Sequence, residues 1–293
     1  MDFLQLRYFQ TTAEMQHITN AAKRLNISQS ALSTTLSRLE KELKVPLFEK
    51  QGRNVVLSPY GKHLMHHCQI ILNEVDDISQ ELKEMQNEQI SYTVLVGVSD
   101  SNYYTDWLVE LFSLLPDYKL KLLQMPSSMI EQKLELGELD FGISTKIRPN
   151  ENIQTLRLLN DPYLLLVSDK NPLFGQKAIP AEQLSKLSFI SLPPTQLRLV
   201  DIVSKELDTH LNIRFEGHSE MMKEVLRVTD GCILTCQHNL RHWMAPTDSD
   251  CSVLKINNLN CRYELFLSWG KQHYLPRPAQ FFREYITSYY RRG

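Results

Sequence analysis

The residues with the most suggestive chemistry are hydroxyls and cations along one side of a predicted helix, from residue 28 or 29 to residue 42. Four leucines of this segment repeat at steps of four, three and four, as in a helix with one buried stripe: Leu32, Leu36, Leu39 and Leu43. The opposite side, here called the hydroxyl face, consists of Ser30, Ser33, Thr34, Ser37, Arg38 and Lys41. Hydroxyls bond base edges or phosphates and cations neutralise phosphate, so this face suits a DNA major groove. An ordinary solvated helix face is the alternative.

A shorter helix and a tight turn precede this segment. Thr19 is placed to cap the shorter helix, and residues 26–28 form a three-residue connection. Ser28 is then a suitable N-cap for the longer helix. This order is that of a helix-turn-helix, whose second helix enters the major groove. Thr19 and Gln29, near the starts of the two helices, join the hydroxyl face as predicted DNA contacts.

A predicted hairpin turns the motif into a winged one. Residues 49–54 have the composition of a β-turn, and residues 55–57 that of the returning strand. Arg53, with Lys50 and Gln51, stands where the tip of a wing meets the DNA backbone or minor groove. The alternative is a solvated surface turn.

The sequence Ser58-Pro59 predicts the start of a long helix that runs to about residue 87. An unbroken apolar seam at steps of four and three lies along it: Leu64, Cys68, Ile71, Val75, Ile78, Leu82 and Met85. Such a narrow seam favours pairing with the same helix of a second chain, and packing onto its own domain is the alternative. His63, His66 and His67 are interpreted as solvated or interfacial side chains, and neither a metal site nor a cofactor is predicted.

Composition describes an ordinary globular protein with a basic N-terminal segment. The net charge of the chain is −2, but eight lysines and arginines against five carboxylates give the first 60 residues +3. The N-terminus carries no secretory signal pattern, and no apolar run approaches the roughly 18 residues needed to cross a membrane. We therefore expect a cytoplasmic protein with no membrane partner, whose five cysteines are reduced.

From residue 92 on, strands and helices alternate, which predicts parallel α/β sheets. The first unit is predicted as strand 92–98, helix 103–115, strand 119–123, helix 128–137 and strand 140–143. The second is predicted as strand 164–168, helix 181–187, strand 189–192, helix 195–210, strand 213–216, helix 219–228 and strand 232–235, with a further strand at 263–269 and a closing helix at 276–290.

The spacing of residues 21–61 resembles the N-terminal domain of LysR-type transcriptional regulators. The matching residues are Ala21, Ala22, Leu25, Ser28, Gln29, Ser30, Ser33, Leu39, Glu40, Leu43, Leu47, Phe48, Leu57 and Gly61. The departures are Lys44 for the usual glycine, Lys50 for arginine, and Ser58-Pro59-Tyr60 for Thr-x-Ala. Lys44 is expected to strain the turn after the second helix.

The resemblance continues through the rest of the chain and is weak at 236–262. It implies a winged helix-turn-helix (residues 1–58, here called the head), a linker helix for dimerisation (59–89), and two Rossmann-like α/β lobes that resemble a periplasmic binding protein. Lobe I would comprise residues 90–160 and 265–293, and lobe II residues 161–264.

Ligands of open α/β lobes bind beyond the carboxyl ends of strands, near helix N-termini. Hydroxyls and amides recur there, which predicts a small polar or anionic effector held by Ser99, Ser101, Ser127, Ser128, Thr145, Thr195, Gln196 and Ser219. Because serine and threonine also cap helices without any ligand, simple capping is the alternative.

The predicted function is that of a sequence-specific, effector-modulated transcriptional regulator, not an enzyme. Its expected partners are double-stranded DNA, a small-molecule effector and further copies of itself, as a dimer or, by resemblance, a tetramer; RNA polymerase is a further candidate. A thiol-based redox regulator remains open, because Cys232 and Cys236 lie near His238 and His242. A cytosolic solute-binding protein or an α/β enzyme would leave the first 60 residues unexplained.

Overall fold

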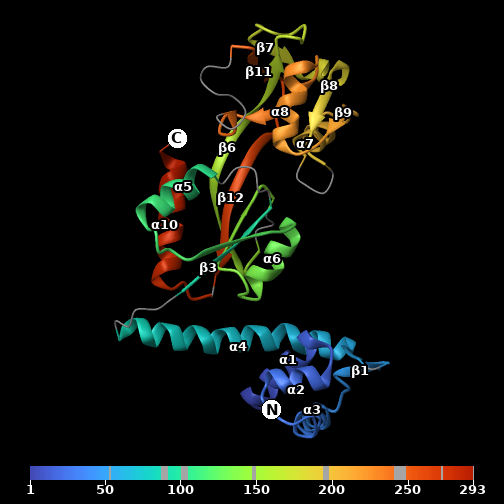
Figure 1. The fold of residues 1–293 in the computed structure, drawn as a ribbon, viewed down its shortest axis with the longest axis vertical. Helices are drawn as coiled ribbons and strands as arrows, with labels where there is room; N and C mark the ends of the chain where they lie inside the picture. Colours follow the sequence, from blue (N-terminus) through green and yellow to red (C-terminus); the bar gives the residue numbers. More distant parts are fainter. Residues whose placement is uncertain are drawn as a thin grey trace. The chain divides into compact units, whose positions relative to one another are not determined.

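The computed structural model of the chain describes residues 1–52, 54–86, 92–99, 105–146, 150–193, 198–240, 249–271 and 273–292. It forms two compact units. The first contains residues 1–92, 133–138 and 272–276, and the second contains residues 93–132, 139–271 and 277–293. The first unit includes the N-terminal helices, a hairpin and the long helix, and the second is an α/β unit (Figure 1).

The elements of the N-terminal part follow the predicted order. They are α1 (Phe3–Met15), α2 (Ile18–Arg24), α3 (Gln29–Leu43), β1 (Phe48–Gln51), β2 (Asn54–Leu57) and α4 (Pro59–Met85). The Asp2 side chain accepts a hydrogen bond from the Gln5 backbone N–H at 2.8 Å and begins α1. Ser28 does the same for α3, accepting from the Ala31 N–H at 3.1 Å. The helix-turn-helix and Ser28 as the N-cap of α3 are therefore confirmed. The prediction that Thr19 caps the shorter helix is wrong, because α2 begins at Ile18 and its N-cap residue is His17, which makes no side-chain capping bond.

One apolar core holds the three helices of the head together. Its fully buried members come from α1, α2, α3 and the segment before β1: Leu6, Phe9, Ala21, Ala22, Leu32, Leu36, Leu39 and Leu47. Glu40, on α3, joins this core to the hairpin because its Oε1 accepts hydrogen bonds from the backbone N–H groups of Leu47 (2.7 Å) and Phe48 (3.2 Å). The first half of α4 packs onto the same core through Cys68 and Leu72.

Lys44 occupies the left-handed C-cap of α3, at φ 59° and ψ 26°. Left-handed backbone costs a residue with a Cβ roughly 1–2 kcal/mol, whereas glycine adopts it freely. The expected strain at this departure from the family pattern is thus present in the backbone.

We expect Lys44→Gly to raise the free energy of unfolding of the head by about 1 kcal/mol, because relief of strain exceeds the entropy that glycine gains in the unfolded chain. Hydrogen–deuterium exchange of peptides from residues 1–58 measures this. Lys23→Gly is the matched control, since Lys23 lies in the helical backbone of α2. It should lower the free energy of unfolding of the head by a similar amount. If both variants raise or both lower this free energy, the backbone of Lys44 is not strained.

The α/β unit contains strands that cross between the two lobes. Its elements are β3 (Val94–Val98), α5 (Thr105–Leu114), β4 (Leu120–Gln124), α6 (Ser127–Glu135), β5 (Phe141–Ser144), β6 (Ile153–Ser168), β7 (Ala178–Pro180), η1 (Ala181–Lys186), β8 (Ser188–Ser191), α7 (Leu199–Glu206), β9 (Asn212–Glu216), α8 (Ser219–Val228), β10 (Cys232–Cys236), β11 (Cys251–Asn257), β12 (Arg262–Gly270) and α10 (Arg277–Arg291). The strands follow the order β4-β3-β5-β12-β6-β10-β8-β9, with β11 paired to β6 and β7.

Each lobe contains a sheet of parallel strands, as predicted. In lobe I, β3 lies between β4 and β5 and is parallel to both. In lobe II, β8 is parallel to both β9 and β10. In Figure 1, α5 and α10 lie on one side of the lobe I sheet and α6 lies on the other. The carboxyl ends of the parallel strands of each lobe therefore meet at one edge of its sheet.

Four elements differ from the sequence prediction. The strand β6 begins at residue 153 rather than 164, and it pairs antiparallel with β12 over nine positions from Ile153 to Pro162. The strands β7 and β11 were not predicted, and the segment expected as a helix at 181–187 is a 3₁₀-helix. The first half of β6 does not alternate in hydrophobicity, so its strand conformation comes from pairing with a segment about 100 residues away.

Candidate functional site

Most of the hydroxyl face of α3 is exposed, and most of its side chains have no partner among the described residues. Leu32, Leu36 and Leu39 are buried below it. Ser30, Thr34, Ser37, Arg38 and Lys41 are exposed, and Ser33 is half-buried. Among the described residues, no hydrogen bond or ion pair engages the side chains of Thr34, Ser37, Arg38 or Lys41. Polar groups in this state are free to bind bases and phosphates.

Two further predicted DNA contacts lie together at the start of α3. The Thr19 hydroxyl donates to Gln29 Oε1 at 3.2 Å, which joins α2 to the first residue of α3. The Ser28 and Ser30 hydroxyls are 3.1 Å apart. The predicted wing forms from β1 and β2, which pair antiparallel from Phe48↔Leu57 to Gln51↔Asn54. Arg53, the predicted contact at its tip, lies outside the described residues.

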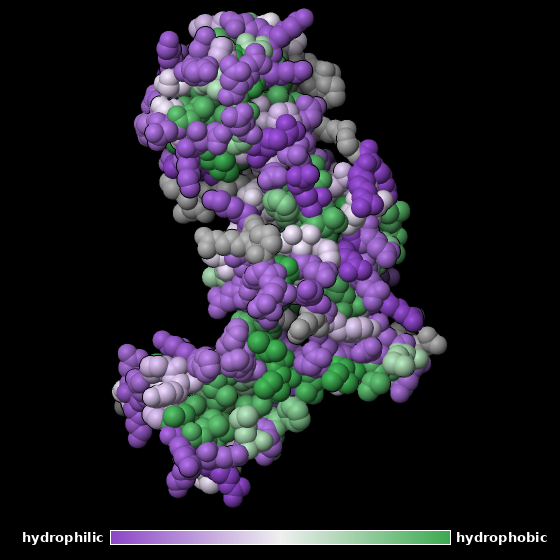
Figure 2. Space-filling model, turned by 180° about the vertical axis from the view of Figure 1, so that it is seen from behind, coloured by the Kyte–Doolittle hydropathy of each residue, from purple (hydrophilic) through white to green (hydrophobic). Residues whose placement is uncertain are grey.

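The apolar seam of α4 divides into two parts. Cys68 is fully buried in the core of the head, where its thiol donates to the Leu6 carbonyl at 3.4 Å, and Leu64 packs against the same core. Val75 is half-buried. The later residues of the seam are exposed: Ile71 by 37%, Ile78 by 48%, Leu82 by 54% and Met85 by 73%. Figure 2 shows this hydrophobic band along α4. The available surface is thus the second half of the seam.

The predicted effector residues of lobe I lie at one edge of its sheet. Ser99 follows β3, and its N–H donates to the Ile143 carbonyl of β5 at 3.1 Å. The Met125 N–H donates to the Val98 carbonyl at 3.0 Å, which brings the start of α6, with Ser127 and Ser128, beside the end of β3. Thr145 directly follows β5. The Ser99 hydroxyl is buried and has no hydrogen-bond partner among the residues that the structure describes.

In lobe II, Ser219 begins α8, next to the carboxyl end of β8. The Gly217 N–H donates to the Ser191 carbonyl at 3.0 Å, which fixes this proximity. His218, the N-cap residue of α8, makes no side-chain capping bond. The simple capping interpretation therefore does not apply to this helix. Ser101, Thr195 and Gln196 lie outside the described residues.

A pocket of about 350 Å³ lies elsewhere in the α/β unit, and no predicted effector residue lines it. It is formed by Asp106, Glu110, Leu159, Asp161, Gln237, His238, Leu240, Tyr289, Tyr290 and Arg292. The His238 N–H donates to Asp161 at 2.8 Å, and Arg292 pairs with Glu110 at 3.0 Å. A shallower depression of about 470 Å³ lies over α10, beside Trp269 and Arg283. No spacing signal predicts these surfaces, because their residues come from separate elements.

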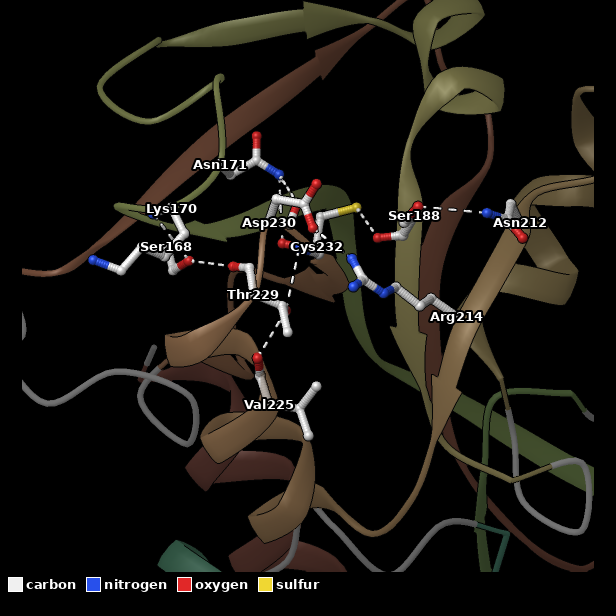
Figure 3. A network of polar contacts seen from close by, with 11 residues as sticks. Ser168, Lys170, Asn171, Ser188, Asn212, Arg214, Val225, Thr229, Asp230 and Cys232 are labelled. Carbon is white, nitrogen blue, oxygen red and sulfur yellow. Dashed lines mark hydrogen bonds and ion pairs between the residues drawn. The ribbon is translucent and has the colours of Figure 1, made fainter.

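The two cysteines of the redox alternative are buried in β10. Burial raises the pKa of the Cys236 thiol to about 12 and that of Cys232 well above its ordinary value. Cys232 donates to the Ser188 carbonyl at 3.4 Å, within the polar network of Figure 3. In this network Ser168 donates to the Thr229 carbonyl at 2.9 Å, and Arg214 pairs with Asp230 at 2.6 Å. The thiols are therefore kept protonated in a tightly bonded region.

Neither a membrane helix nor a preformed metal cluster is found in the described part of the chain. No helix there is long and apolar enough to cross a bilayer. No group of three or more His, Cys, Asp and Glu side chains among the same residues is arranged to hold a metal ion as it stands.

A winged helix-turn-helix, a long helix and two α/β lobes together define a DNA-binding transcriptional regulator with a ligand-binding domain. Residues 3–62 match the model of the bacterial regulatory helix-turn-helix protein, lysR family, and residues 87–291 match the LysR substrate binding domain. The chain belongs to the LysR family of transcriptional regulators. Regulators of this family bind DNA and effector ligands and form oligomers.

Individual relatives agree with this assignment. The chain is 28% identical over 294 residues to the uncharacterized HTH-type transcriptional regulator YybE of Bacillus subtilis, covering 99% of both chains. A full-length OxyR from Pseudomonas aeruginosa has the same fold, with a TM-score of 0.72, 23% identity and coverage of 99% of this chain and 95% of that chain. The fold is also that of CbnR in complex with its target DNA, with a TM-score of 0.60, 18% identity and coverage of 98% and 99%.

Proposed function

We propose that this regulator contacts its operator through the hydroxyl face of α3, supported at the start of α3 by Thr19 and Gln29 and at the wing by Arg53. The observation that carries this proposal is the row of exposed side chains of Thr34, Ser37, Arg38 and Lys41 opposite a buried leucine stripe. These side chains have no partner in the part of the chain that the structure describes. The face offers two cations and mostly hydroxyls, so few bidentate base contacts are available. DNA shape and the second head of a dimer then supply much of the specificity.

The effector binds at the carboxyl edges of the two sheets, with Ser99, Ser101, Ser127, Ser128 and Thr145 from lobe I and Thr195, Gln196 and Ser219 from lobe II. The buried Ser99 hydroxyl without a partner supports this location, because a buried polar group left unpaired costs free energy that a ligand would recover. Effector binding shifts the equilibrium between arrangements of the DNA-binding heads.

We further propose boundaries for the four parts of the chain. The head comprises residues 1–58, and the linker helix comprises residues 59–89. Lobe I comprises residues 90–160 and 265–293, and lobe II comprises residues 161–264. The exposed half of the α4 seam supports dimerisation, since four large apolar side chains on one helix stripe gain by burial against a second copy. Assembly continues to a tetramer, and the protein works in the cytoplasm as a regulator without catalysis.

Gel shifts with the DNA upstream of its own gene test the DNA-binding part. The affinity should fall steeply with salt, and unrelated DNA of equal length should bind more weakly. Equal binding of both DNAs would contradict the proposal.

The effector location has its own test. The ligand is first identified by mass spectrometry of protein purified from its native host. Ser99→Ala should then weaken ligand binding about 5- to 10-fold, because one hydrogen bond is lost, and leave the unliganded protein at least as stable as before, because an unpaired buried hydroxyl is removed. Ser268→Ala, which removes another buried hydroxyl without a partner, is the control and should bind the ligand normally. Unchanged affinity of Ser99→Ala would contradict this location.

A redox-responsive regulator is the second candidate. It is favoured by 26% identity over 195 residues to the hydrogen peroxide-inducible genes activator of Haemophilus influenzae, with 66% of this chain and 64% of that protein covered. Against it, four residues along a strand separate the Cα atoms of Cys232 and Cys236 by about 13 Å, beyond the roughly 7 Å that a disulfide spans.

We expect a small molar excess of hydrogen peroxide to leave Cys232 and Cys236 reduced, because the thiolate is the reactive form and their raised pKa values suppress it. Mass spectrometry after alkylation counts the free thiols. Oxidation of both cysteines in the native protein, with altered DNA binding, would replace the first candidate with the second.

The same raised pKa values predict a pH dependence of stability. The thiols of Cys232 and Cys236 have a lower pKa in the unfolded chain than in the folded one, so the free energy of unfolding should fall as pH rises above about 9.

A further inference from the structure

Three of the nine histidines of the chain lie within five residues of α4, outside every site described above. They are His63, His66 and His67. Their positions i, i+3 and i+4 place them on one side of the helix. All three are exposed, and burial therefore does not explain their grouping.

The imidazole rings are already spaced like ligands of one ion. The ring centres of His63 and His67 are 4.9 Å apart, and those of His66 and His67 are 5.3 Å apart. Two imidazoles bound to a tetrahedral ion, with metal–nitrogen distances of about 2.0–2.1 Å, have ring centres about 5 Å apart. The ring planes meet at 73° and 79°, so the two pairs are not stacked face to face.

We propose that α4 carries a binding site for a divalent first-row transition metal ion, with His63 and His67 as its first two ligands. The chemistry of imidazole selects Cu²⁺, Ni²⁺ or Zn²⁺ over Mg²⁺ and Ca²⁺, which prefer oxygen. Exposed side chains rotate at little cost, so His66 completes a third ligand position after ring rotation and water fills the rest.

Metal binding at this place acts on the helix that carries the head. The i, i+4 ligands bridge one turn of α4 between its Ser58 cap and Cys68, which anchors α4 in the core of the head. An ion bound only by the helical form stabilises that form in proportion to the logarithm of its concentration. The site therefore links metal availability to the rigidity of the start of the linker helix. It goes beyond the proposed effector site in the α/β unit.

The test uses full-length protein without a histidine tag. Ni²⁺ is added, free metal is removed by gel filtration, and bound nickel is counted by plasma mass spectrometry. We expect about one ion per chain. His67→Gln removes the shared ligand and should weaken Ni²⁺ binding about 100-fold, because chelation is lost. His66→Gln should weaken it less.

His210→Gln, which removes another exposed histidine, is the matched control and should bind Ni²⁺ as the unmodified protein does. Circular dichroism verifies that each variant is folded, which exposed positions should allow. With Cu²⁺ in place of Ni²⁺, electron paramagnetic resonance should show at least two coordinated nitrogens, and fewer in His67→Gln. Equal Ni²⁺ binding by His67→Gln and the unmodified protein would overturn the proposal, as would equal loss in His210→Gln.

Discussion

Ser37→Glu should reduce operator affinity about 100-fold or more while the oligomer stays intact. Ser37 is exposed in the middle of the hydroxyl face, three residues from Thr34 and four from Lys41. A carboxylate there would face the phosphates of the groove, and like charges brought together at an interface cost several kcal/mol. Because the buried leucine stripe lies on the other side of α3, the substitution leaves the core of the head unchanged.

Fluorescence anisotropy with labelled operator DNA measures the affinity, and light scattering measures the oligomer. Gln183→Glu is the matched control, because it adds the same charge at an exposed position of the α/β unit. It should bind the operator almost as the unmodified protein does, since distant exposed charges are screened. If Ser37→Glu disrupts the oligomer or binds normally, the face of α3 has been assigned wrongly.

Gly61→Ala should destabilise the head by about 3 kcal/mol, a large effect for one methyl group. A Cβ on Gly61 would lie 2.1 Å from the carbonyl oxygen of Leu47. That oxygen accepts the Ser58 N–H at 2.9 Å, and the Ser58 hydroxyl caps α4 by accepting the Gly61 N–H at 3.0 Å. The methyl group would therefore push α4 away from the segment before β1 and disrupt these two hydrogen bonds.

Gly52→Ala separates steric overlap from backbone strain. Gly52 has a φ of 63°, but a Cβ there meets no atom within 4 Å. We expect it to cost only about 1 kcal/mol, from the left-handed backbone. Hydrogen–deuterium exchange of peptides from residues 1–58 compares the two variants. Equal destabilisation would show that the contact with Leu47 is not the cause.

Local signals in the sequence were sufficient to predict the helices of the head and the alternation of strands and helices in the α/β unit. Caps such as Ser28 and Ser58, and the leucine spacing of α3, depend on residues within one or two turns, so they are visible in the linear chain. The hydroxyl face follows from the same periodicity. It is exposed in the structure because the leucines opposite it are buried in the core.

Contacts between distant segments decided the rest. Glu40 belongs to the family pattern, but only the fold shows that its carboxylate holds the hairpin. The seam of α4 is continuous in the sequence, yet Cys68 faces the head and Met85 is exposed, because the head covers only the first half of the helix.

The same holds for β6 and for the 350 Å³ pocket, which depend on segments far apart in the sequence. By itself, the sequence determined the family, the order of most elements and the side of α3 that is exposed, because these depend on local spacing. Which part of the linker helix stays exposed, and where the buried hydroxyls and thiols lie, was decided by tertiary structure, because burial depends on segments that the chain brings together only on folding.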